Sequence, residues 1–212
     1  MNKNKLALQE HYSFEDLMEL VALLRSPEGC PWDRVQTHES IRNNFVEEAY
    51  EVCEGIDRRD DVLLCEELGD VLLQVVFHTS IAADEKRFGA QEVIDGVCRK
   101  MIRRHPHIFG GENISENDIQ KNWDLIKKQE KGEQSLSDTL SRISSALPAL
   151  KRAEKYIEKG AVPPKISPED PLLKKGETLF QTVRECMDEE LDPEQALNTY
   201  LKHVLKNCTN CE

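Results

Sequence analysis

Apolar residues recur every three or four positions along almost the whole chain, and no convincing run alternates as a half-buried strand does. This spacing predicts an all-α protein. The expected helices span residues 13–25, 39–57, 60–86, 90–104, 115–131, 146–160, 172–187 and 193–206. Ser13, Ser115 and Asp192 stand where a side chain can cap a helix N-terminus, and prolines mark several of the intervening loops.

The helix expected over residues 39–57 has the pattern of an ordinary amphipathic helix. Its apolar stripe, expected to face a core, comprises Phe45, Ala49, Val52 and Ile56. Three acidic residues lie largely opposite that stripe, namely Glu47, Glu48 and Glu51. Taken alone, this helix favours a solvated acidic face over a binding site.

The helix expected over residues 60–86 is apolar nearly all round, which predicts burial on most sides. One narrow polar stripe runs along it, formed by Glu67, Asp70, Gln74 and His78. Buried carboxylates are costly unless they are paired or bound to metal, and no Lys or Arg precedes Lys86 on this helix. The pattern therefore favours a cation site, whereas His78 fits a satisfied core histidine better than a ligand.

The two acidic clusters can form a single site. Residues three apart on a helix share a face, with Cβ atoms about 5–6 Å apart. Glu48 therefore neighbours Glu51, and Glu67 neighbours Asp70. The short turn between the helices predicts antiparallel packing, which lets the pairs converge. Four carboxylates suit Mg²⁺, with Mn²⁺ as a substitute, whereas a di-iron bundle would need Glu-x-x-His pairs.

Composition narrows the choice of partners. The 212 residues include 28 Lys and Arg against 40 Asp and Glu, giving a net charge of −12. This charge argues against binding nucleic acid or an anionic membrane, but it does not exclude a small phosphorylated ligand. The N-terminal residues lack the apolar run of a signal peptide, and the seven cysteines have no framework spacing, so we expect a cytoplasmic protein. Cys208 and Cys211 fit a neutral tail better than a zinc site, which needs four ligands.

Several blocks of the sequence resemble one family. "EEAYE" followed by "ELGD" is similar to the Glu-Glu-x-x-Glu … Glu-x-x-Asp signature of the MazG-type nucleoside triphosphate pyrophosphohydrolases. The blocks "LRSPEGCPWDRVQTHESIR", "EELGDVLLQVVFH", "KMIRRHPHIFGG" and "NWDLIKKQEK" resemble the same family and occur in its order. Together they cover about residues 14–131.

The resemblance implies an all-α helical bundle that forms a tight homodimer and hydrolyses nucleoside triphosphates to the monophosphate and pyrophosphate with Mg²⁺. By position it implies four magnesium ligands, Glu48, Glu51, Glu67 and Asp70. It places Glu47 at a second ion or the attacking water. It also implies phosphate contacts by Lys100 and Arg104, and a nucleotide contact by Trp123. From the residues alone, a basic last turn and ordinary aromatic packing explain the latter three.

The second half departs from the family pattern. We expect a catalytic domain over residues 1–131 and a degenerate second MazG-like helical region over residues 132–212, in which "SALPALKRAEK" resembles the segment that opens the family's second domain. A faint internal echo aligns Glu67 and Asp70 with Lys174 and Glu177, so the acidic motif is missing there, although chance similarity can also explain the match. The alternative to an enzyme is a non-catalytic helical module that binds nucleotides or a regulatory partner.

Overall fold

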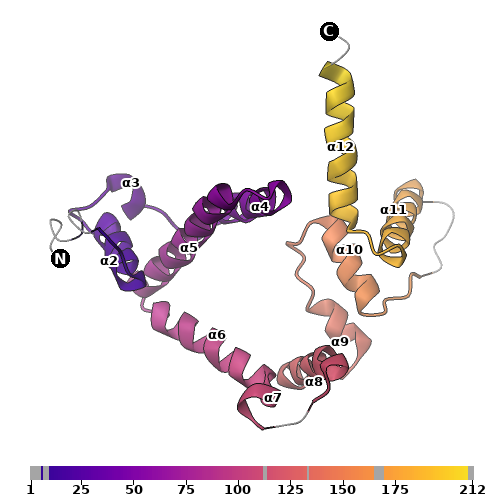
Figure 1. The fold of residues 1–212 in the computed structure, drawn as a ribbon, viewed down its shortest axis with the longest axis horizontal. Coiled ribbons are helices and arrows are strands. Elements are labelled where there is room, and N and C mark those ends of the chain that lie inside the picture. Colours follow the sequence, from indigo (N-terminus) through magenta and orange to yellow (C-terminus); the bar gives the residue numbers. More distant parts are fainter. Residues whose placement is uncertain (1–5, 7–9, 112–113, 133, 165–169, 210–212) are drawn as a thin grey trace. The chain divides into compact units, whose positions relative to one another are not determined.

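The structure, a computed structural model, describes Leu6 and residues 10–111, 114–132, 134–164 and 170–209. These residues form helices, turns and loops without a strand among them, which confirms the all-α expectation (Figure 1). The chain divides into two compact units, Met1–Glu112 and Asn113–Glu212. Residues 113–131, which their sequence assigns to the first domain, are grouped with the second unit.

The eight predicted helices are present among the described residues with bounds that differ by a few residues, and three further short helices occur in segments that were not predicted to be helical. In the first unit they are α2 (Phe14–Arg25), α3 (Pro31–Arg34), α4 (Arg42–Arg58), α5 (Asp61–Asp84), α6 (Ala90–Arg104) and α7 (Pro106–Phe109). In the second unit they are η1 (Glu116–Asp118), α8 (Ile119–Lys131), α9 (Leu136–Ser141), α10 (Ala149–Glu158), α11 (Pro171–Asp188) and α12 (Pro193–Thr209). No helix among the described residues is long and apolar enough to cross a membrane.

Capping residues fix several helix starts. The Ser13 hydroxyl accepts a hydrogen bond from the Asp16 amide at 3.2 Å, and Asp16 accepts one from the Ser13 amide at 2.9 Å, so α2 begins with a capping box. Asp192 likewise accepts from the Gln195 amide at 2.9 Å. The cap expected at Ser115 is wrong, because its hydroxyl donates to the Asp118 carboxylate and a 3₁₀ turn precedes α8.

Helices α4 and α5 form an antiparallel hairpin around a very short turn (Figure 1). Arg59 adopts a left-handed conformation with φ 55°, and Asp60 caps α5 by accepting from two backbone amides. Gly55 lets the helices approach, since a Cβ there would lie 3.0 Å from the backbone N and Cα of Leu64. The hairpin therefore depends on a glycine at this position.

The core of the first unit lies between α2, the loop before α4, and the second half of α5. It comprises Val21, Ile41, Val76, Phe77 and Ile81, with Phe14, Leu17, Met18 and Leu73 packed against it. Arg25, at the end of α2, donates to the Asp84 carboxylate at 2.8 Å and to the Asp33 carbonyl at 3.0 Å. This arginine thereby ties the α3 region to the end of α5.

Two burial expectations for the hairpin are wrong. Ile56 of the expected core stripe is 57% exposed, and Ala49 is also exposed. The first half of α5 is not buried on most sides, because Val62 and Leu68 are 79% and 51% exposed. Helix α2 packs only against part of α5, so much of the apolar surface of the hairpin meets no other helix of its unit.

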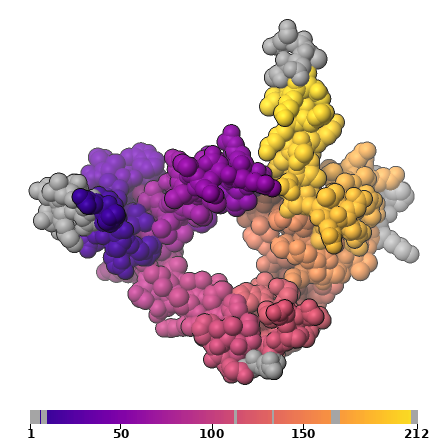
Figure 2. Space-filling model, viewed as in Figure 1, coloured from indigo at the N-terminus to yellow at the C-terminus, as the bar shows by residue number. Residues whose placement is uncertain are grey.

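The second unit packs α10, α11 and α12 together. Lys151 of α10 bridges the buried Glu154 at 2.7 Å and Asp192, the residue before α12, at 3.1 Å. In Figure 2 the yellow α12 extends beyond the helices α10 and α11 on which its start packs. Cys208 is exposed, and Cys211 lies outside the described residues.

We expect Gly55→Ala to destabilise the protein by about 1–3 kcal/mol, because the added methyl group must push the α5 backbone away. Gly69→Ala is the matched control on α5, where an added Cβ meets nothing within 4 Å. The control is expected to gain about 0.5–1 kcal/mol from better helix propensity. Urea unfolding of both variants measures the difference, and equal effects would contradict the close approach at Gly55.

Candidate metal centre

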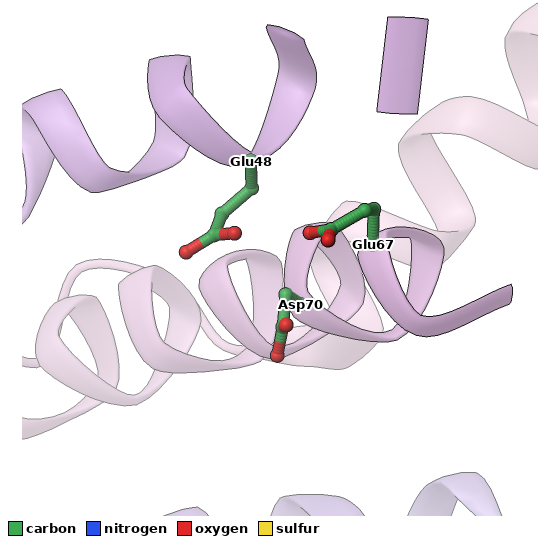
Figure 3. A group of neighbouring side chains, drawn as sticks. All are labelled: Glu48, Glu67 and Asp70. Atoms are coloured by element: carbon green, nitrogen blue, oxygen red, sulfur yellow. The ribbon is translucent and has the colours of Figure 1, made fainter. Parts of the chain in front are cut away.

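Three carboxylates from the hairpin meet at one point. Glu48 projects from α4, and Glu67 and Asp70 project from adjacent turns of α5 (Figure 3). One carboxylate oxygen of each residue lies within 4.8 Å of the others. Glu67 is 9% exposed, whereas Glu48 and Asp70 are half-buried. The antiparallel turn and the three-residue spacing within α5 bring these groups together, as the sequence predicts.

The charges in this group oppose one another. Burial, followed by the nearby Asp70 carboxylate, raises the pKa of Glu48 above its ordinary value. Burial, followed by Glu51 and Glu66, likewise raises the pKa of Glu67. A divalent cation would remove this repulsion, and hard carboxylate oxygens are the ligands that Mg²⁺ prefers. The residues present therefore fit a magnesium ion.

The other acidic residues of the hairpin are not part of this group of three ligands. Glu51 lies close enough to help raise the pKa of both Glu48 and Glu67, but it is exposed and is not one of the three grouped ligands. Glu47 is exposed on α4. The structure thus groups three of the four predicted ligands and leaves the fourth beside them. Glu66, which the sequence reasoning did not single out, adds negative charge next to Glu67.

The predicted substrate-binding residues come from both units. Lys100 and Arg104 lie one turn apart on α6 and are half-buried in the first unit. Trp123 is half-buried on α8, in the second unit. Their contacts with a nucleotide stay predictions.

The polar stripe of α5 continues away from the carboxylates to a histidine pair. The His38 and His78 rings stack with centroids 5.0 Å apart, and their Nδ1 atoms are 2.7 Å apart. Arg87 contacts Nε2 of His38. Because an arginine can only donate, this Nε2 accepts, and Nδ1–H of neutral His38 donates to Nδ1 of His78. His78 is thus a satisfied histidine, as expected, and only its partner in the loop was missed.

We expect the histidine pair to make stability depend on pH. Burial, followed by His38, lowers the pKa of His78 below 6.5. The unfolded chain then takes up this proton first as the pH falls, so stability present above pH 6.5 is lost as the pH falls through that value. Glu48 and Glu67, whose pKa values are raised, change stability with pH in the opposite direction. Both His78→Gln and the unchanged protein contain these carboxylates, so their effect cancels when the two proteins are compared. Urea unfolding at several pH values should show a weaker acid loss in the variant, and parallel curves would contradict this assignment.

We also expect the carboxylates to respond to Mg²⁺. Glu67→Gln should raise the melting temperature in a chelator, because it removes one of the repelling charges. At a free Mg²⁺ concentration of about 100 times the Kd, binding to the unchanged protein should stabilise the fold by about 2.7 kcal/mol. Glu67→Gln should reduce this stabilisation. Glu54→Gln is the control, since Glu54 is exposed on α4 and pairs with Arg58. Equal Mg²⁺ stabilisation of both variants would place any ion elsewhere.

The fold and this group define the class: an all-α protein with a candidate divalent-cation site on a helix hairpin. Residues 36–109 match the model of the MazG nucleotide pyrophosphohydrolase domain. Two curated relatives carry related names. The nucleoside triphosphate pyrophosphohydrolase/pyrophosphatase MazG of Thermotoga maritima is 48% identical over 68% of this chain and 55% of its own length. The nucleoside triphosphate pyrophosphohydrolase of Escherichia coli K12 is 41% identical over 66% of this chain and 54% of its own length.

A solved structure, the mazG-related protein from Thermotoga maritima, is 30% identical with a TM-score of 0.46, covering 54% of this chain and 98% of that one. The chain spans about half the length of the two curated relatives. The chain belongs to the MazG family, and the matched segment contains the whole carboxylate group.

Proposed function

We propose that this protein is a nucleoside triphosphate pyrophosphohydrolase that uses Mg²⁺, or Mn²⁺ as a substitute. The observation that carries the proposal is the group formed by Glu48, Glu67 and Asp70 within a MazG domain. The names of the relatives, which are nucleoside triphosphate pyrophosphohydrolases, support the same reaction. A role in clearing or regulating the nucleotide pool of the cytoplasm fits this chemistry.

In the proposed reaction, a water oxygen attacks the α-phosphorus of the triphosphate. The bond from the α-phosphorus to its bridging oxygen breaks, pyrophosphate leaves, and a carboxylate takes up the water proton. Bound Mg²⁺ supplies a lowered pKa for water and offsets the phosphate charge. The three grouped carboxylates would hold the ion, and a rotation of the exposed Glu51 side chain would add a fourth ligand.

The other predicted residues have separate tasks. Lys100 and Arg104, one turn apart on α6, donate to phosphate oxygens and stabilise the charge that develops on them. Glu47 supports a second ion or orients the attacking water, and Trp123 contacts the nucleotide. These assignments rest on the positions of the residues in the family motifs.

The proposal includes a homodimer. Several large apolar side chains of the first unit are exposed on the hairpin and on α6, among them Val46, Tyr50, Leu68, Leu72, Val97 and Ile102. Apolar surface of this extent is typical of a surface that another chain covers. The net charge of −12 argues against nucleic acid as the partner.

We expect the purified protein with Mg²⁺ to release a nucleoside monophosphate and pyrophosphate from nucleoside triphosphates, which ³¹P NMR can follow. Glu48→Gln should lower kcat at least about a hundredfold, because it removes one charge from the metal site. Glu54→Gln, on the same helix but outside the group, should keep full activity.

The products decide between the alternatives. Release of orthophosphate would contradict attack at the α-phosphorus. Nucleotide binding with Mg²⁺ but without turnover would instead favour the non-catalytic helical module. A panel of normal and modified triphosphates in the same assay identifies the preferred base and sugar.

A further inference from the structure

The polar stripe of α5 includes a residue that belongs neither to the carboxylate group nor to the histidine pair. Gln74 lies one turn beyond Asp70 and one turn before His78. It is only 9% exposed, and its side-chain amide makes no hydrogen bond with the residues that the structure describes. A buried amide without a partner is costly, because it has given up its hydrogen bonds to water. The described part of the fold therefore gives no structural reason for an amide at this position.

The Gln74 amide is buried but not sealed off. Among the described residues, the fully buried side-chain polar atoms without a partner are Nε of Arg25 and one carboxylate oxygen of Glu154. The oxygen and nitrogen of Gln74 are not among them, so they border space that water can enter. A ligand in this space would find a donor and an acceptor on one side chain.

The facing helix contains a second amide of the same kind. Asn44 lies one turn before Glu48 on α4, and because α4 and α5 are antiparallel, this places it on the same side of the carboxylate group as Gln74. Asn44 is half-buried, and its side chain also makes no hydrogen bond with the described residues. The adjacent Phe45 ring lies against the His78 ring, with centroids 5.9 Å apart, so this part of α4 faces the second half of α5.

In the opposite direction the hairpin is closed. Towards the turn the two backbones are in contact, since a Cβ on Gly55 would lie 3.0 Å from the backbone of Leu64. The half-buried residues between the carboxylate group and the turn include Val52 and Leu63, which are apolar. A polar ligand that extends along the hairpin from the carboxylate group therefore runs towards Gln74.

The position of Gln74 determines which part of a nucleotide it meets. One helical turn separates it from Asp70, a rise of about 6 Å along α5. In a nucleoside triphosphate the sugar is joined directly to the α-phosphate, and the base lies beyond the sugar. The 3′-hydroxyl is the sugar hydroxyl separated from the α-phosphorus by the fewest bonds. A hydroxyl both donates and accepts, so it matches an amide, whereas a phosphate oxygen only accepts.

We propose that the side-chain amide of Gln74 binds the 3′-hydroxyl of the nucleotide sugar and thereby determines sugar specificity. This inference rests on the proposed function, since it requires the α-phosphate to lie at the carboxylate group. The hydroxyl supplies the partner that the buried amide lacks among the described residues. Ribonucleotides and 2′-deoxyribonucleotides both have this hydroxyl, and 2′,3′-dideoxynucleotides lack it.

Turnover of a matched pair of substrates tests the proposal. The pair is a 2′-deoxynucleoside triphosphate and the 2′,3′-dideoxynucleoside triphosphate of the same base, and pyrophosphate release measures kcat/KM. The unchanged protein should use the dideoxy substrate about tenfold less well, because the amide then stays buried without a partner. Gln74→Met has a side chain of similar length without an amide, so it should use both substrates equally well. Gln91→Met on α6 is the matched control and should keep the tenfold ratio, since Gln91 is exposed and bonds to Asp95.

Thermal unfolding separates this role from a structural one. Gln74→Met should melt at the same temperature as the unchanged protein or at a higher one, because it removes a buried amide that has no partner in the described fold. A lower melting temperature together with an unchanged substrate ratio would assign the amide to the fold and overturn the proposal.

The outcomes also distinguish this proposal from the proposed function. If no triphosphate releases pyrophosphate, the hydrolysis is contradicted, and the affinities of the same two nucleotides in Mg²⁺, measured by calorimetry, test the tenfold ratio instead. Absence of nucleotide binding overturns both proposals. Turnover with equal use of the two substrates by the unchanged protein overturns the sugar contact and leaves the hydrolysis intact. A tenfold ratio that persists in Gln74→Met overturns the role of Gln74, and poorer use of both substrates would then place its amide at the cation or the attacking water.

Discussion

The close contact between α4 and α5 is the constraint on which the candidate metal centre depends. Gly55 allows the α5 backbone near Leu64 to lie against α4, and the left-handed Arg59 reverses the chain within a very short turn. With the two helices antiparallel at this distance, Glu48 comes opposite Glu67 and Asp70. A hairpin held further apart would separate the carboxylates of α4 from those of α5.

The same packing creates an electrostatic cost. The raised pKa values of Glu48 and Glu67 express the free energy that burial and neighbouring carboxylates add to the charged forms. No basic partner from α5 relieves this repulsion, because that helix contains no Lys or Arg. A bound cation would relieve it, so folding and cation binding are thermodynamically linked at this site.

Sequence patterns predicted the features that depend on local spacing. The helices, the Ser13 and Asp192 caps, and the pairing of Glu67 with Asp70 follow from residues at most four positions apart. The expected ligand Glu51 stays beside the group, because a spacing places a side chain on a face but does not fix its rotamer.

Features that depend on contacts between distant segments were harder to predict. An apolar stripe looks the same whether it packs inside one chain or against another, which is why Ile56 was expected in the core but is exposed. The partner of His78 lies 40 residues away in a loop, where no periodic pattern identifies it. Ser115 has a residue type suited to capping, but the 3₁₀ turn that follows depends on how the segment is packed.

Net charge likewise described the whole chain without describing its parts. The value of −12 argued against a polyanionic partner, and it does so for extended surfaces such as nucleic acid. At the group formed by Glu48, Glu67 and Asp70, the electrostatic cost is likewise set by the nearest carboxylates and not by the net charge of the chain, because Coulomb energy falls with distance and salt screens the remote groups.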